Sequence, residues 1–91
     1  MVALLAQYIR GDYIMKAIMW SKPGCPFCVK AEKLLTLKGY QVEERKIGFG
    51  WNRDQLFEAV PNARTVPQIF LDGEYIGGHE DLVKYFAAKS V

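Results

Sequence analysis

The sequence predicts a single α/β domain built around a mixed β-sheet. Short apolar runs alternate with amphipathic segments in the order strand, helix, strand, helix, strand, strand, helix. The first strand–helix–strand unit should be parallel and right-handed, whereas an Asp-Gly pair joins the last two strands as an antiparallel hairpin. The 91 residues, of which 51% are hydrophobic, suffice for one compact core and are too few for two.

The first half of the chain contains the parallel unit. Residues 16–21 (KAIMWS) form a short apolar run that is typical of a buried strand, and a loop over 22–24 follows. A helix is expected to begin at Cys25, because Pro26 suits the first helical position, and to end at Gly39. The inward-facing residues of this helix should be Ala31, Leu34 and Leu35.

A second strand and a second helix complete this half. Residues 40–47 (YQVEERKI) alternate well enough for a strand, and a glycine-rich turn over 48–52 follows them. Asn52 is a plausible N-cap for the helix that comes next, which Pro61 should end. The expected inward-facing residues are Leu56, Phe57 and Val60.

The remaining elements are a hairpin and a last helix. Residues 67–71 (PQIFL) and 74–77 (EYIG) read as antiparallel strands around the Asp-Gly turn. The last helix should start near His79, with acidic residues in its positive first turn. Its expected buried residues are Leu82, Val83 and Phe86.

Residues 1–14 are treated as an extension that precedes a domain over 15–91. Leu4, Leu5 and Tyr8 fall at helical spacing, which favours a short amphipathic helix packed on the domain. A loose tail, or an upstream start with Met15 as the functional beginning, explains the same residues equally well. All three interpretations stay open.

Composition excludes several classes of function. The formal charge of +2 and the isoelectric point of about 8.6 are too weakly basic for a typical nucleic-acid binder. No apolar run approaches the ~20 residues of a membrane helix, and the first residues lack the features of a secretory signal. Two cysteines cannot build a disulfide scaffold. We therefore expect a cytoplasmic protein.

Cys25 and Cys28, within SKPGCPFC, carry the chemistry. A structural zinc site needs four ligands, but apart from these two cysteines the chain offers only His79, so no metal is expected. Two buried cysteines with a purely structural role are a second alternative. A redox pair is favoured, because a helix N-terminus stabilises a thiolate and the nearby Lys22 adds positive potential. Cys25 should then attack, and Cys28, one turn on, should resolve the mixed disulfide.

At this point the sequence resembles the short dithiol class of glutaredoxins. The resemblance rests on four segments in family order: 22–28 (KPGCPFC), 65–70 (TVPQIF), the Gly-Gly at 77–78 and 80–82 (EDL). It extends over about residues 16–89. It implies a thioredoxin-like fold, with a four-stranded mixed sheet and helices on both faces. It also implies reduction of protein disulfides and glutathione mixed disulfides, with glutathione as the source of electrons.

The resemblance also implies a glutathione site. Pro67 should follow a cis peptide bond, and the backbone of Val66 should pair with the cysteinyl part of glutathione. Lys22 should meet the glycine carboxylate and Asp81 the γ-glutamyl end, while Arg64 and Gln55 are weaker candidates for carboxylate contacts. An ordinary surface charge for Arg64 and a helix-start role for Asp81 stay open. The expected binding residues are Lys22, Phe27, Arg64, Thr65, Val66, Pro67, Gly78, His79, Glu80 and Asp81.

Two residues depart from or vary within the family pattern. Phe27 stands where the family usually has tyrosine, so we expect activity with altered fine recognition. His79 occupies a variable position and is expected to be an exposed residue at the helix start rather than a group that tunes the thiolate.

The resemblance makes the chain an expected electron donor in cell redox homeostasis. Glutathione and disulfide-containing proteins such as ribonucleotide reductase are the expected partners, and we expect a monomer. Two other functions stay open: a redoxin supplied by a flavin reductase, and a module that carries an iron–sulfur cluster. Lys22 and Asp81 argue against the first, while Pro26 and Cys28 argue against the second.

Overall fold

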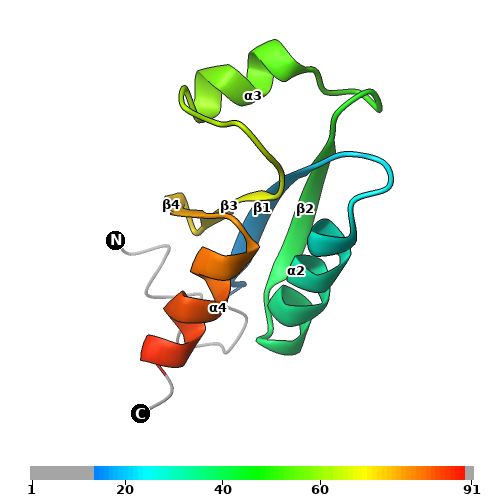
Figure 1. The fold of residues 1–91 in the computed structure, drawn as a ribbon. Helices are drawn as coiled ribbons and strands as arrows, with labels where there is room; N and C mark the ends of the chain where they lie inside the picture. The colour runs from blue at the N-terminus through cyan, green and yellow to red at the C-terminus, as the bar shows by residue number, and fades with distance from the viewer. Residues whose placement is uncertain (1–13, 90–91) are drawn as a thin grey trace.

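The computed structural model describes residues 14–89, so the expected extension over 1–14 lies outside the described part except for Ile14. Figure 1 shows the elements in space. In chain order they are β1 (Lys16–Ser21), α2 (Pro26–Leu37), β2 (Gln41–Lys46), α3 (Arg53–Ala59), β3 (Gln68–Leu71), β4 (Glu74–Gly77) and α4 (His79–Ala88). Within residues 14–89, no helix combines the length and the apolar character needed to cross a membrane.

The four strands form one mixed sheet in the order β2-β1-β3-β4. The β1–β2 pair is parallel, and β3 pairs antiparallel with both β1 and β4. Helices α2 and α4 lie together, with α3 apart from them at the top of the view in Figure 1. The predicted four-stranded mixed sheet with helices on both faces is therefore confirmed.

Alternation along β1 builds a core on each face of the sheet. Ala17 and Met19 are fully buried in a cluster with Leu35 of α2 and Leu82 of α4. Trp20 points to the other face, because successive strand residues alternate sides, and it packs in a second cluster below α3. One strand thus anchors all three helices.

Helix α2 ends as the sequence predicts, at a glycine. The N–H of Gly39 donates to the carbonyl of Thr36, and the N–H of Tyr40 donates to the carbonyl of Leu35, each at 3.0 Å. This double closure needs a left-handed residue, and Gly39 supplies it with φ +89°. The buried residues Ala31 and Leu35 then fix the position of α2 on the sheet.

Helix α3 is short and contacts the core through one row of side chains. Its N-cap Asn52 accepts a hydrogen bond from the N–H of Gln55 at 2.8 Å, and the Gln55 side chain accepts one from the N–H of Asn52 at 2.9 Å. Leu56 and Val60, four residues apart, pack against Trp20. The expectation that Phe57 is also buried is wrong: it is 44% exposed, because it lies beside that row.

A charged group on β2 borders the second cluster. Glu43 accepts a hydrogen bond from Arg45 at 2.7 Å and pairs with Lys16 at 3.2 Å, and these contacts hold the pKa of Glu43 below its usual value. The guanidinium of Arg45 lies 4.3 Å from the ring centre of Trp51, which packs edge-on against Trp20. The ion pair thus keeps Arg45 over the aromatic edge of the core.

The hairpin and α4 follow the sequence with one correction. Asp72 and Gly73, both with positive φ, form the predicted turn between β3 and β4. Leu82 is buried in α4, and Tyr85 and Phe86, three and four residues on, pack against the same core. Val83 was expected to be buried but is 44% exposed, because it lies off this row.

Gly77 joins β4 to α4 in a conformation that excludes a side chain. Its φ is +122°, and a Cβ there would lie 2.5 Å from Oδ2 of Asp81, which accepts a hydrogen bond from the N–H of Gly78. Gly77→Ala should therefore lower the free energy of unfolding by about 1–2 kcal/mol more than Gly48→Ala does. Gly48 is the matched control, because it has φ +90° and open space around its Cβ position.

Urea denaturation of the two variants provides the measurement. Equal losses would show that left-handed strain alone matters at Gly77 and that the cap at the start of α4 is not displaced.

Candidate active site

The first cysteine caps helix α2 with its sulfur. Cys25 is the N-cap, with extended backbone angles (φ −109°, ψ 99°), and Pro26 follows at the first helical position. The backbone N–H of Cys28 donates to Sγ of Cys25 at 3.1 Å. The predicted start of the helix at Cys25 is confirmed. An N–H of the first helical turn, which has no carbonyl partner within the helix, and the positive end of the helix dipole therefore face this sulfur.

The two cysteines are joined in a disulfide, and their Cα atoms lie 5.2 Å apart. Both are largely buried, Cys25 at 8% and Cys28 at 3% exposure. Cys25 follows the exposed loop at Lys22–Gly24, whereas Cys28 lies inside the first turn of α2 and packs in the core cluster. Access therefore favours reaction at Cys25.

The segment before β3 lies against this disulfide. The Val66–Pro67 peptide bond is cis, as the resemblance implies, and the carbonyl oxygen of Val66 lies 3.8 Å from Sγ of Cys25. Pro67 does not belong to the strand, because β3 begins at Gln68; the expected start of the strand at Pro67 is wrong by one residue. The backbone of Val66 is thus placed where a substrate bound to Cys25 would meet it.

A buried polar side chain fixes this segment, and the sequence did not single it out. The amide nitrogen of Gln68 donates to the carbonyl of Thr65 at 2.9 Å, and the hydroxyl of Tyr75 donates to Oε1 of Gln68 at 2.6 Å. Gln68 is only 6% exposed. A glutamine inside the apolar run of β3 was the available hint, because a buried amide needs partners. Strand β4 thereby supports the Thr65–Pro67 turn through Tyr75.

One cavity of about 370 Å³ opens beside the start of α4. The side chain of Asp81 accepts the hydrogen bond from the N–H of Gly78 at 3.2 Å, so it has the capping role that the sequence left open. The rings of Phe27 and His79 lie 5.6 Å apart, and Phe27 is 56% exposed. The lining residues are Phe27, Thr65, Val66, Pro67, Gly78, His79, Glu80 and Asp81.

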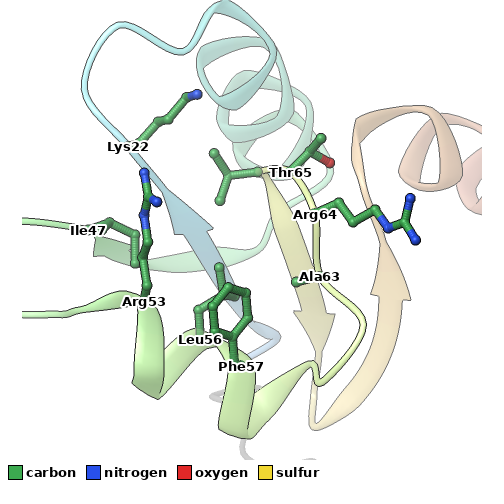
Figure 2. A pocket seen from close by; sticks show the side chains of 9 residues that line it. Lys22, Ile47, Arg53, Leu56, Phe57, Ala63, Arg64 and Thr65 are labelled. Atoms are coloured by element: carbon green, nitrogen blue, oxygen red, sulfur yellow. The ribbon is translucent and has the colours of Figure 1, made fainter.

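A second cavity, of about 410 Å³, lies on the other side of the same segment. Figure 2 shows Arg53 pointing toward the loop that carries Lys22, the amine of Lys22 pointing away from Arg53, and Leu56 and Phe57 below. Its lining residues are Lys22, Ile47, Arg53, Leu56, Phe57, Ala63, Arg64, Thr65 and Val66. Thr65 and Val66 line both cavities, so the two cavities meet at this segment, and the carbonyl oxygen of Val66 lies beside Sγ of Cys25.

For three side chains around the second cavity, the position in the structure differs from what the sequence predicts. Arg53 was not among the predicted residues, because an arginine at the start of a helix reads as surface charge. Gln55 was expected near a carboxylate, but its side chain caps α3 instead. Arg64 lines the cavity, yet its guanidinium points away from Lys22 in Figure 2. Arg53 points toward the loop that carries Lys22, so these two residues bring positive charge to the same side of the cavity.

Each predicted binding residue lines at least one of the two cavities, which share Thr65 and Val66. That they bind glutathione stays a prediction. Among the described residues, no group of three or more histidine, cysteine or acidic side chains could hold a metal ion. The arrangement combines a sulfur that caps α2, a partly exposed segment at Thr65 and Val66, and cavities with charged residues on either side of that segment, and it suits disulfide exchange.

Comparison with known proteins agrees with this geometry. The family model described as Glutaredoxin matches residues 17–76. The chain is 48% identical over 69 residues to a hybrid peroxiredoxin, hyPrx5, of Haemophilus influenzae; the match covers 76% of this chain and 28% of that protein. It is 38% identical over 65 residues to glutaredoxin 3 of Escherichia coli, covering 70% of this chain and 77% of that one.

Solved structures extend the similarity to the fold. The crystal structure of glutaredoxin 1 from Francisella tularensis, complexed with cacodylate, superposes with a TM-score of 0.67 at 32% identity and covers 82% of this chain and 94% of that one. The mixed sheet with its three helices is thus the thioredoxin-like fold of the glutaredoxins. The chain therefore belongs to the glutaredoxin family and, through its Cys25–Cys28 pair, to the thiol–disulfide oxidoreductases.

Proposed function

We propose that the protein reduces protein disulfides and glutathione mixed disulfides, with glutathione as its reductant. The observation that carries the proposal is the hydrogen bond from the N–H of Cys28 to Sγ of Cys25. In the reduced protein the same N–H would face a thiolate, and a hydrogen bond to an anion is stronger than one to a neutral sulfur. The proposal places the reaction in the cytoplasm, where glutathione is kept reduced.

Reduction of a protein disulfide proceeds in two exchanges, whereas on a glutathionylated substrate a glutathione molecule can take the place of Cys28 in the second. The thiolate of Cys25 attacks one sulfur of the substrate disulfide, and the other sulfur leaves as a thiolate that takes up a proton. Cys28 then attacks Sγ of Cys25, releases the reduced substrate and forms the Cys25–Cys28 disulfide. Two glutathione molecules return the pair to the dithiol and leave as glutathione disulfide. Two electrons pass from glutathione to the substrate in each cycle.

The cavities provide charges that match glutathione. The tripeptide carries a carboxylate at each end and an ammonium group at its γ-glutamyl end. Lys22 and Arg53 would meet the glycine carboxylate, and the N-terminus of α4 would meet the other carboxylate. The cysteinyl backbone would pair with Val66, whose carbonyl lies beside Sγ of Cys25. Asp81 would hold the ammonium group.

Substitution of each cysteine tests the proposed roles. Cys25→Ser should lower turnover of both glutathionylated and protein dithiol substrates by roughly 100-fold or more, because the nucleophile is lost. Cys28→Ser should keep most activity toward a glutathionylated substrate, which needs only Cys25, and lose reduction of protein disulfides. A coupled glutathione assay measures both. Equal loss of the two activities in Cys28→Ser would contradict the division of roles.

The pH dependence of alkylation tests the thiolate. With the protein reduced, iodoacetamide should label Cys25 with a midpoint well below pH ~8.5, the value of a free cysteine, because the start of α2 stabilises the anion. Mass spectrometry assigns the label to Cys25 or Cys28. A midpoint at the ordinary value would remove the electrostatic basis of the proposal.

Two protein acceptors are proposed. Ribonucleotide reductase is the acceptor that the family resemblance implies. A peroxiredoxin is the second, because 48% identity links the chain to a protein named a hybrid peroxiredoxin, against 38% for glutaredoxin 3 of Escherichia coli.

Direct competition separates the two acceptors. Initial rates should be measured with oxidised peroxiredoxin and oxidised ribonucleotide reductase at equal concentration, in the presence of glutathione. We expect the peroxiredoxin to be reduced at least several-fold faster, since kcat/KM reports how well each partner fits the site. Equal rates, or faster reduction of ribonucleotide reductase, would contradict this preference.

A further inference from the structure

The second cavity is larger and more apolar than a glycine carboxylate needs. Lys22 and Arg53 lie at its mouth, and its floor consists of apolar side chains. The terminal glycine of glutathione has no side chain that could cover this apolar floor. Phe57 lies at this floor with 44% of its surface exposed. The other apolar lining residues there are Ile47, Leu56 and Ala63. An occupant with a side chain would cover this surface.

We propose that this cavity binds the two residues that follow the reactive cysteine of a protein substrate, the first apolar and the second acidic. The inference rests on the proposed function and specifies its substrate class. An apolar side chain would pack on Phe57 and Leu56, and an acidic one would reach Lys22 and Arg53 at the mouth.

The direction of the substrate follows from the backbone. Along the chain, residues 63–66 line this cavity and residues 65–67 line the cavity at the start of α4. A segment that pairs antiparallel with Val66 therefore runs from the α4 cavity toward this one. With its cysteine at Cys25, the residues after that cysteine enter the second cavity, at about 3.3–3.6 Å per residue.

Charge decides the chemistry of the second of these residues. The cavity lining includes Lys22, Arg53 and Arg64, and it includes no acidic side chain. A carboxylate bound among these cations would be attracted to them and would reduce their mutual repulsion. A lysine at that position of the substrate would add to the repulsion instead.

Activated peptides test the proposal without glutathione. Three blocked peptides, Ser-Cys-Leu-Glu, Ser-Cys-Leu-Lys and Ser-Cys-Gly-Gly, are prepared as mixed disulfides with 2-thiopyridine. Cys25 of the pre-reduced protein attacks the peptide sulfur and thiopyridone leaves, so its absorbance gives the rate of a single turnover. We expect Leu-Glu to react roughly tenfold faster than Gly-Gly, since partial burial of leucine is worth about that factor. Leu-Lys should be slower than Leu-Glu, and added salt should reduce that difference only.

Matched variants locate the effect. Phe57→Ser should bring the Leu-Glu to Gly-Gly ratio below about three, and Phe57→Leu should keep most of it, since the packing surface is retained. Phe49→Ser is the control, because Phe49 is 67% exposed and does not line the cavity; it should leave the ratio unchanged. Arg53→Gln should narrow the gap between Leu-Glu and Leu-Lys.

The results of these experiments distinguish failure of the proposed substrate preference from failure of the proposed function. Equal rates for the three peptides, or an equal fall of the ratio in Phe57→Ser and Phe49→Ser, would overturn the substrate preference while disulfide exchange stands. No reaction with any peptide would overturn the proposed function and the inference with it.

Discussion

The hydrogen bond from the N–H of Cys28 to Sγ of Cys25 is the interaction on which the site depends. It forms because Cys25, directly before the helix, has extended backbone angles, and because Pro26 at the first helical position has no N–H that needs a partner. The orientation of this hydrogen bond is fixed by the packing of α2, because Ala31 and Leu35 are buried between the helix and the sheet. The packing of α2 on the core thus fixes the position of its N-terminus, so the positive end of the helix dipole stays directed at Sγ of Cys25.

The proposed recognition of substrates depends on a second fixed element, the Thr65–Pro67 segment, which lies between the two cavities. Its backbone would be free to turn if only its own residues held it. Gln68 binds the carbonyl of Thr65, and Tyr75 of the neighbouring strand binds Gln68, so the hairpin holds the segment in place. Sulfur chemistry and substrate pairing are therefore supported by different parts of the sheet, α2 on β1 and the turn on β3 and β4.

The sequence predicted the features that local rules control. Helix starts and stops at Cys25 and Gly39 follow from capping, and the Asp-Gly hairpin follows from turn chemistry. Side-chain burial was predicted less well at Phe57 and Val83, because each lies one position from a buried residue and only the packing geometry separates the two. The approach of Arg53 to Lys22 depends on where α3 crosses the sheet, and no local pattern in the sequence encodes that position.

The exposure of Phe57 follows from the same geometry that leaves the cavity open. Helix α3 has about two turns, and its buried row consists of Leu56 and the C-cap residue Val60, so Phe57 beside this row stays partly exposed. Trp20 already fills the space below, which prevents α3 from moving closer to the sheet. The apolar floor and the cations at the mouth are thus brought together by the packing of α3. For that reason we assign this side of the site to side chains that glutathione lacks, and the backbone of Val66 to what all substrates share.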